Sequence, residues 1–283
     1  MLSYYFPKSE NGLTYSLDMV RFKFKITQES CFETMNYLRH FEHKYSFSTK
    51  AFNYRELFTI YIKDNSFSIG LCFNGISKND FFNCFIQFNP NKVGCSKELD
   101  STLAFLRRRW QNCELVNYDI AIDIPCKRSE VVLKKDRRLH KRHTFDSTGE
   151  NVTEYLGTDS EYGRCKLYNK TIESKLDYTL TRLEITSNKI DYDIFMTQFP
   201  DVVFFKDLDM FDMVKLSKTD LVLLKLLSLT DDPIFYFKQL GKDKQKTLHP
   251  FVQDTASRVG ISRQIFERIM SQINFFKNNA NFI

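Results

Sequence analysis

Tyrosine, acidic and basic side chains are concentrated in residues 155–186, whose sequence is YLGTDSEYGRCKLYNKTIESKLDYTLTRLEIT. A second segment upstream, residues 116–125 (VNYDIAIDIP), adds two carboxylates. Carboxylate oxygens suit Mg²⁺ or Mn²⁺, a bound metal ion polarises a phosphate, and a tyrosine hydroxyl beside it can act as a nucleophile. The two segments together predict phosphodiester chemistry.

Each of these segments has the pattern of a β-strand, in which successive side chains point to opposite faces. The alternation gives every strand one charged face, with Asp119 and Asp123 in the first, Lys166, Tyr168 and Lys170 in the second, and Arg182 and Glu184 in the third. If these faces meet in one sheet, the carboxylates form a metal site beside the tyrosine. The alternative is that the charges are the solvated faces of amphipathic strands and pair with one another.

The elements that would position these strands begin upstream with an alternating segment, residues 20–26. Its apolar side chains alternate with Arg21, Lys23 and Lys25, so we expect a strand with a basic open face that contacts DNA. Ser30 followed by Glu33 resembles a capping box, which predicts a helix starting there.

Further strands are expected at residues 57–63, 67–73 and 81–88, joined as antiparallel hairpins by polar turns. Helical spacing of apolar residues from Leu99 to Trp110 then predicts a helix before the strand that carries the two aspartates. A second, shorter set follows, with a helix near residues 130–139 and strands near Thr153, Lys166 and Arg182.

This order of elements predicts an α+β fold of antiparallel sheets with helices packed on one face. We expect one α+β domain over residues 1–205, built from two related sheet-plus-helix units at about 15–125 and 126–205. Helical patterns dominate residues 206–283, which we expect to form a separate C-terminal region.

Composition restricts the class of protein. The chain has 41 Lys and Arg against 35 Asp and Glu, a net charge of +6 that suits a polyanion binder but is common elsewhere. Its seven cysteines form no CxxC pair, and no segment has the length of a membrane span or the pattern of a signal peptide. We expect a cytoplasmic protein with reduced thiols and no membrane contact.

A basic run, residues 127–142, directly follows the aspartate strand. Such runs are usually solvated, but this one adjoins the predicted site and could follow a DNA backbone. The expected phosphate contacts in it are Lys134, Lys135, Arg137 and Arg138. Arg182, on the charged face of the third strand, is a further expected DNA contact.

The C-terminal segment has the spacing of a helix-turn-helix, with Ala256, then Gly260 four residues on, and a cap-like Ser262. In that arrangement the groove-facing side chains are Arg263, Gln264 and Arg268. An ordinary helical hairpin gives the same pattern.

The motifs DMVRFKFKI, YDIAID, YLG, KLYNK with Glu173, and TRLEIT occur in an order that resembles the rolling-circle plasmid replication initiators of the Rep_trans group, which are related to MobT-type relaxases and filamentous phage initiators. The resemblance covers roughly residues 16–188. It implies a nicking and closing enzyme that joins a tyrosine to the 5′ phosphate of a cut DNA strand and leaves a 3′ hydroxyl as a primer.

By position, the resemblance assigns the nucleophile to Tyr168 and the metal-site acids to Asp119, Asp123 and Glu184. Lys166 and Lys170 would then belong to the catalytic group, and Lys170 would neutralise the phosphate. Glu173 is either a further ligand or an acid at a helix start. The implied cofactor is Mg²⁺ or Mn²⁺.

The sequence departs from the family pattern at two places. Lys166 stands where an arginine is frequent, and the histidine-hydrophobe-histidine cluster of other families is absent, since His140 and His143 flank two basic residues. The competing tyrosines are Tyr155, Tyr162 and Tyr178.

Two other functions are also compatible with the sequence. An origin- or operator-binding protein without chemistry would share the basic segments, and a conjugative relaxase would use the same chemistry on another DNA site. The expected partner is a plasmid origin presented as a single-stranded or cruciform nick site, with a host helicase and a second copy of the chain as further partners.

Overall fold

The computed structural model describes residues 8–10, 12–47, 56–71, 81–94, 96–128, 131–133, 141–145, 152–157, 163–200, 202–204, 217–228, 233–252 and 259–278. Most of its strands form one 11-stranded sheet in the order β3-β4-β5-β6-β2-β7-β12-β11-β10-β9, with β1 (Lys8–Glu10) paired to β2. All its neighbouring strands are antiparallel. The predicted α+β class is confirmed.

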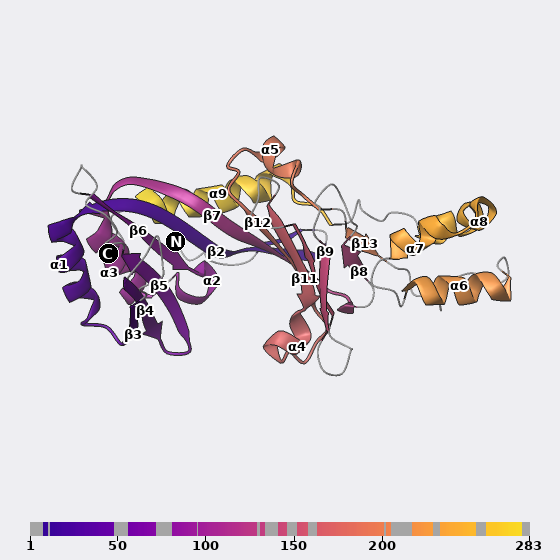
Figure 1. Ribbon diagram of the computed structural model, residues 1–283, viewed down its shortest axis with the longest axis horizontal. Helices are drawn as coiled ribbons and strands as arrows, with labels where there is room; N and C mark the ends of the chain where they lie inside the picture. Colours follow the sequence, from indigo (N-terminus) through magenta and orange to yellow (C-terminus); the bar gives the residue numbers. More distant parts are fainter. Residues whose placement is uncertain are drawn as a thin grey trace.

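Two long strands, β2 (Leu13–Thr27) and β7 (Gln111–Ile124), lie at the centre of the sheet and pair with each other. On the β2 side lie β6 (Phe81–Phe88), β5 (Asn65–Leu71), β4 (Glu56–Ile62) and β3 (His43–Phe47). On the β7 side lie β12 (Thr181–Ser187), β11 (Arg164–Asn169), β10 (Val152–Leu156) and β9 (Lys141–Phe145). The sheet therefore runs without interruption through both predicted units (Figure 1).

The helices pack mainly against one face of this sheet, as predicted. They include α1 (Gln28–Leu38), α3 (Lys97–Arg107), α5 (Tyr192–Met196) and α9 (Arg263–Asn278). Their buried apolar side chains form one core with alternate residues of β2 and β7, among them Phe22, Phe24, Tyr118 and Ile120, all 0% exposed. Short helices α2 (Pro90–Val93) and α4 (Lys170–Ser174) follow β6 and β11. The opposite face of the sheet is left for polar side chains.

Several predicted boundaries shift. The first helix begins at Gln28 with Thr27 as its N-cap, not Ser30, because the Thr27 hydroxyl accepts from the Ser30 amide at 3.2 Å. The helix predicted to reach Trp110 ends at Arg107. In the segment expected to be helical, β8 (Val131–Leu133) is a strand paired with β13 (Val202–Phe204), and residues 134–139 lie outside the described residues.

The C-terminal helices divide between two cores. α6 (Lys218–Ser228), α7 (Pro233–Gln239) and α8 (Lys242–Val252) share a small core of their own, and Figure 1 shows them at one end of the molecule. Helix α9 instead belongs to the core of the sheet. The division near residue 205 stays a prediction. Within the described ranges, no helix is both long and apolar enough to cross a membrane.

A β-bulge interrupts the pairing of the two central strands. Leu17 lies opposite Ile120 and Met19 lies opposite Asp119, so Asp18 is the extra residue. Bulges redirect a side chain and are frequent beside active sites. Here the bulge turns the Asp18 carboxylate towards the polar face, where it contacts Asn89 and Arg182.

Candidate active site

Strand register brings the predicted catalytic residues together on the polar face of β2, β7, β12 and β11. Three parallel rows of cross-strand neighbours cross these strands. The first, the Tyr168 row, contains Thr14, Asp123, Arg182 and Tyr168. The middle row contains Ser16, Ala121, Glu184 and Lys166, and the third, the Asp119 row, contains Met19, Asp119, Thr186 and Arg164. The three charged faces predicted from the sequence therefore meet.

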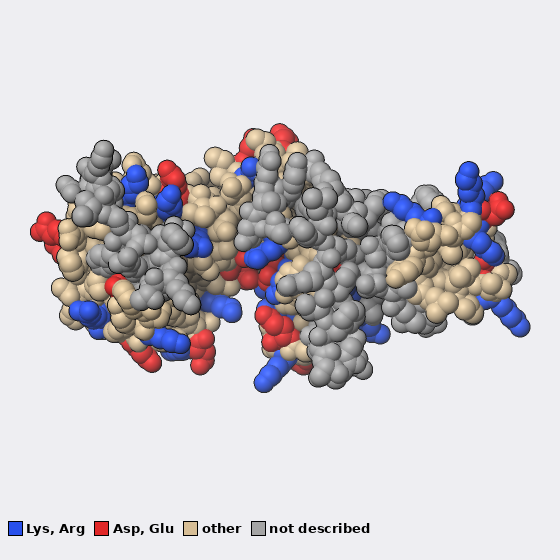
Figure 2. Space-filling view, viewed as in Figure 1, with Lys and Arg blue, Asp and Glu red and all other residues tan. Residues whose placement is uncertain are grey.

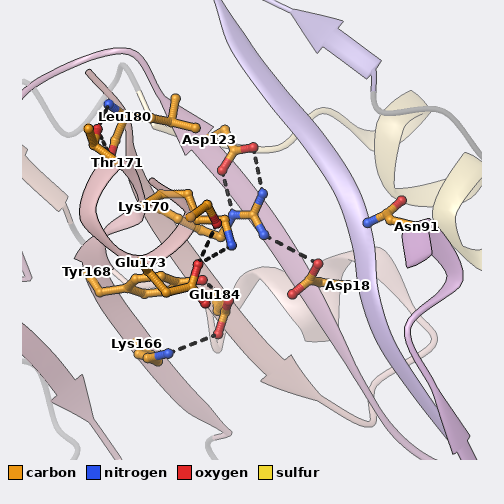
Figure 3. Close-up of polar contacts among 12 residues, drawn as sticks. Asp18, Asn91, Asp123, Lys166, Tyr168, Lys170, Thr171, Glu173, Leu180 and Glu184 are labelled. Carbon is orange, nitrogen blue, oxygen red and sulfur yellow. Dashed lines mark hydrogen bonds and ion pairs between the residues drawn. The ribbon is translucent and has the colours of Figure 1, made fainter. Parts of the chain in front are cut away.

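Tyr168 lies against a carboxylate. Its hydroxyl donates a hydrogen bond of 2.5 Å to Oε1 of Glu184, which belongs to the next strand and the next row (Figure 3). The tyrosine is only 4% exposed, and burial, followed by the negative charge and hydrogen bond of Glu184, raises its pKa above the ordinary value. The phenol is therefore protonated at neutral pH, with a proton acceptor already in contact.

Two lysines flank this pair. The Lys166 ammonium lies 3.8 Å from the centre of the Tyr168 ring and 3.9 Å from Oε2 of Glu184. Lys170, in the first turn of α4, lies 5.8 Å from the same ring and forms an ion pair with Glu173. Burial would raise the pKa of Glu173, but the hydrogen bonds and charge of its neighbours lower it, chiefly those of Lys170. Glu173 is thus the partner of a site lysine.

Arg182 is held by two carboxylates. Its Nε and Nη2 donate to the two oxygens of Asp123 at 2.6 and 2.8 Å, and its Nη1 lies 3.4 Å from Oδ1 of Asp18. Burial would lower the pKa of the Arg182 guanidinium, but the hydrogen bonds and charges of Asp123 and Asp18 outweigh it and raise that pKa. Because Arg182 lies directly opposite Tyr168, its fixed positive charge stands beside the phenol.

Asp119 is in the opposite situation. Its Oδ1 is buried without a hydrogen-bond partner anywhere in the described part of the chain. Burial raises the pKa of the Asp119 carboxyl from 3.8 to about 6, the charges of Glu184 and Asp18 act in the same direction, and Thr186 and Arg164 act against it. The residue is partly buried and Thr186 hydrogen-bonds to its carboxyl, so the orphaned atom is the one oxygen Oδ1, and a buried polar atom without a partner needs an explanation.

The predicted set of three metal ligands does not converge in this arrangement. Asp119 and Asp123 are four residues apart on one strand, about 13 Å between Cα atoms, and both oxygens of Asp123 are taken by Arg182. Among the described residues, no group of three or more His, Cys, Asp or Glu side chains could hold a metal ion. Asp119 and Glu184, which interact electrostatically, suit the one or two carboxylates that Mg²⁺ commonly uses. Metal binding stays a prediction.

Charged side chains also gather where the surface is hollowed. Figure 2 shows acidic and basic atoms in the hollow between the part of the molecule with β3–β6 and the part with α4. The predicted DNA contacts of β2 lie on this polar face, where the Arg21 guanidinium stands 4.2 Å from the centre of the Phe85 ring. Lys23 is partly buried and Lys25 is exposed. The predicted contacts Lys134, Lys135, Arg137 and Arg138 lie outside the described residues, as do His140 and Tyr162.

The helix-turn-helix residues have other partners. Arg263 forms an ion pair of 2.8 Å with Asp193 and covers the ring of Tyr192, while Gln264 is exposed and Arg268 partly buried. The start of α9 is fixed by main-chain contacts, because the Tyr15 and Tyr192 hydroxyls donate to the carbonyls of Gly260 and Ile261 at 2.7 and 2.9 Å. Ala256 lies outside the described residues. Helix α9 thus packs on the sheet core, whereas Leu248 of α8 belongs to the separate helical core.

Sequence reasoning missed two polar residues that complete the site, Asp18 and Asn89. The Asn89 amide donates to Oδ1 of Asp18 at 3.0 Å, although 71 residues separate them. A signal for Asp18 was present, because the adjacent apolar residues Met19 and Val20 break the alternation of the strand, as a bulge requires. No local pattern marks Asn89.

Comparisons with known proteins add little. No family model matches the sequence, and no curated protein does. A similar solved structure is a rolling circle replication initiator protein from Geobacillus stearothermophilus, with 13% identity and a TM-score of 0.39 over 94% of this chain and 96% of that chain. A likeness at this level assigns neither a fold nor a function to this chain.

Proposed function

We propose that the protein is a replication initiator that nicks one strand of a plasmid origin through Tyr168, using Mg²⁺ or Mn²⁺, to give a 5′-phosphotyrosine link and a 3′-hydroxyl primer for rolling-circle replication. The observation that carries the proposal is the 2.5 Å hydrogen bond from the Tyr168 hydroxyl to Glu184, between two lysines. The order of the sequence motifs supports replication as the process.

Glu184 is the general base of the proposed reaction. A phenol with a raised pKa does not ionise unaided at neutral pH, so a group in contact must take its proton as the bond to phosphorus forms. Tyr168 Oη attacks the phosphorus, the bond from phosphorus to O3′ breaks, and the departing O3′ takes up a proton. The reverse attack by a 3′ hydroxyl on the phosphotyrosine closes the strand and returns the tyrosine.

Lys166 and Lys170 are the cations for the phosphate. Both already lie at the tyrosine ring, and the Lys166 side chain is 31% exposed, so it can move from the ring to a phosphate that approaches from the solvent. Cations that meet the developing negative charge lower the barrier of phosphoryl transfer. Arg182 stays with its two aspartates and supplies a fixed positive charge beside the phenol.

Asp119 and Glu184 are the residues that would hold a divalent ion. When bound, such an ion supplies Lewis-acid polarisation of the phosphate oxygens. The orphaned Oδ1 of Asp119 would gain a partner. Asp123 would hold Arg182 in place.

The test uses supercoiled DNA carrying the cognate origin, with Mg²⁺ or Mn²⁺, and follows nicked product and covalent protein–DNA adduct. We expect Tyr168→Phe to lower both by about 10³-fold or more, since it lacks the nucleophile. Tyr45→Phe is a matched control, because Tyr45 also donates to a glutamate, Glu56, but at the far edge of the sheet.

Three results are informative. Adduct formation lost only in Tyr168→Phe supports the proposal. Equal nicking by both variants would still support a nicking enzyme but would reject Tyr168 as its nucleophile. DNA binding by the wild-type protein without any nicking would reject the enzymatic proposal in favour of a binding protein.

A further inference from the structure

An open pocket of about 300 Å³ lies beside the site, between the start of β5, the end of β6 and α2. Asn65, Ser66 and Ser68 line it from β5, Gln87 from β6, and Lys92 from α2. Met19 and Phe88 are also among its lining residues. Its volume is at the lower end of the range for small-ligand pockets, about 300–1,000 Å³.

The pocket lies on the same face of the sheet as Tyr168. Ser68 is the cross-strand neighbour of Gln87, and Gln87 that of Arg21, so these side chains continue the polar face across β5, β6 and β2. Met19, which lines the pocket, lies opposite Asp119 in the Asp119 row. The pocket and the site are therefore adjacent regions of one surface.

Hydrogen bonds also connect the two regions. Asn89, another lining residue, donates to Asp18, and Asp18 accepts from Arg182, the neighbour of Tyr168. Between them, Asn117 Oδ1 and Asp119 Oδ1 are buried without hydrogen-bond partners in the described ranges. Such atoms need an explanation, and a polar ligand on this surface would supply a partner for the Asn117 oxygen, as the divalent ion would for that of Asp119.

The side chains of the pocket suit a nucleobase. The amide groups of Asn65 and Gln87 each offer a donor and an acceptor, the combination that pairs with a base edge. Neither amide makes a side-chain hydrogen bond, and Lys92 forms no ion pair, within the residues that the structure describes. Lys92 is exposed and suits a backbone phosphate, while the carboxylate of Asp64, also in the lining, would accept from an exocyclic amino group.

We propose that this pocket binds a base of the single-stranded DNA close to the cleaved phosphate and selects it through the Asn65 and Gln87 amides. The inference rests on the proposed function, since it names a part of the substrate of the same site. Base contacts of this kind give roughly tenfold discrimination each.

The main experiment supplies wild-type protein and variants with a pool of single-stranded DNA of random sequence and Mg²⁺. Covalently attached DNA and the released 3′-hydroxyl fragments are recovered and sequenced, which gives the base preference on both sides of the nick. We expect Gln87→Ala and Asn65→Ala to lose roughly tenfold of the preference at one position near the nick and to keep it elsewhere.

Matched controls are Gln28→Ala, which removes an exposed amide at the start of α1, and Lys44→Ala, which removes an exposed lysine from β3. Both should keep the wild-type preference at every position. Lys92→Ala should lower the adduct yield for all sequences alike, because a phosphate contact carries no base information. Base preferences in Gln87→Ala and Asn65→Ala that equal those of wild type would overturn the pocket proposal while nicking stands.

A second measurement separates the two proposals if wild-type protein forms no adduct. Equilibrium binding of single-stranded dA, dC and dT oligonucleotides is compared between wild type and Gln87→Ala by fluorescence anisotropy. A preference among the three that is lost in the variant supports the pocket, although the nicking proposal has then failed. Equal binding of all three by the wild-type protein would overturn the pocket as well.

Discussion

The Tyr168 row and the Asp119 row lie on the same face of the same strands, yet their aspartates have opposite surroundings. Asp123 uses both oxygens in hydrogen bonds to Arg182. Asp119, four residues earlier, has a buried oxygen without a partner and a pKa raised to about 6. We call the Tyr168 row complete, because both oxygens of its aspartate have partners within the protein. We call the Asp119 row incomplete, because one oxygen of its aspartate has no partner among the described residues.

In our proposal, the difference between the two rows marks a position where the protein gives up some stability for its function. A buried charge with a well-placed partner roughly recovers its desolvation cost, whereas an unpartnered one does not. The complete row positions Arg182 and the strand that carries Glu184. In our proposal, the incomplete row keeps the Asp119 carboxylate available for a divalent ion.

Breaking the complete row should have the largest effect on stability. Arg182→Met removes the partner of Asp123 and Asp18, whose side chains are only 16% and 20% exposed. We expect the free energy of unfolding to fall by about 3 kcal/mol, since two carboxylates lose their cation in partly buried positions. Urea unfolding followed by circular dichroism measures it.

Arg109→Met is the matched control for this change. Its salt bridge with Glu33 joins α1 to the turn after α3 at the surface, where the glutamate side chain is 47% exposed, so we expect a loss of about 0.5 kcal/mol or less. Equal losses in the two variants would show that the Tyr168 row is no more than a surface ion pair.

Removing the charge of Asp119 from the incomplete row should have the next largest effect on the free energy of unfolding, and this effect should be an increase. Asp119→Asn should raise the free energy of unfolding by about 2 kcal/mol at pH 8, because the buried charge disappears. The folded-state pKa lies above 3.8, so the carboxyl favours folding only while protonated, and its contribution is lost as pH rises through about 6. The gain of the variant over wild type should therefore vanish by about pH 4.

The same substitution in the other row gives the sharpest test of the comparison. Asp123→Asn removes a partner from Arg182, and we expect it to destabilise the protein where Asp119→Asn stabilises it. Both variants should lose nicking activity. A stabilising Asp123→Asn, or a destabilising Asp119→Asn at pH 8, would mean that the two rows do not differ as described.

The sequence predicted this surface well where local pattern decides structure. Period-two alternation placed Asp119, Asp123 and Glu184 on the charged faces of their strands, and the register brings those faces together. The α+β class and the predicted hairpin strands follow from the same physics, since alternation and turn residues act within a few positions. Alternation and turn residues do not reveal the partners of residues that meet only through the pairing register of distant strands.

Two mismatches share that cause. The sequence grouped Asp123 with Asp119 as metal ligands, but cross-strand pairing gives Asp123 to Arg182. It offered no sign that Asn89 would contact Asp18, because the two meet only when β6 and β2 pair. The helix-turn-helix pattern before α9, which an ordinary helical hairpin shares, stays a prediction, because residues 253–258 lie outside the described residues.

A divalent ion bound at Asp119 should offset part of the free-energy cost of holding this carboxylate in the folded protein. At ten times the dissociation constant, Mg²⁺ or Mn²⁺ should stabilise the wild-type protein by about 1.4 kcal/mol. Asp119→Asn should not respond, and EDTA should remove the effect together with nicking. Thermal unfolding at several ion concentrations measures this without depending on activity. A response of equal size in Asp119→Asn would place the ion elsewhere.

The smallest effect on stability is expected for Lys166→Met, in the middle row. The side chain is 31% exposed and its ammonium is as far as 3.9 Å from Glu184, so the ion pair contributes little, and the contact with the Tyr168 ring adds about 0.5 kcal/mol. Nicking should nevertheless fall roughly tenfold or more, because a cation that meets the phosphate is lost. Since Met keeps most of the side-chain volume over the ring, a large loss of stability with unchanged nicking would make Lys166 a structural residue. A small change in stability together with a large loss of nicking would therefore show that the Lys166 ammonium acts on the substrate and not in stabilising the fold.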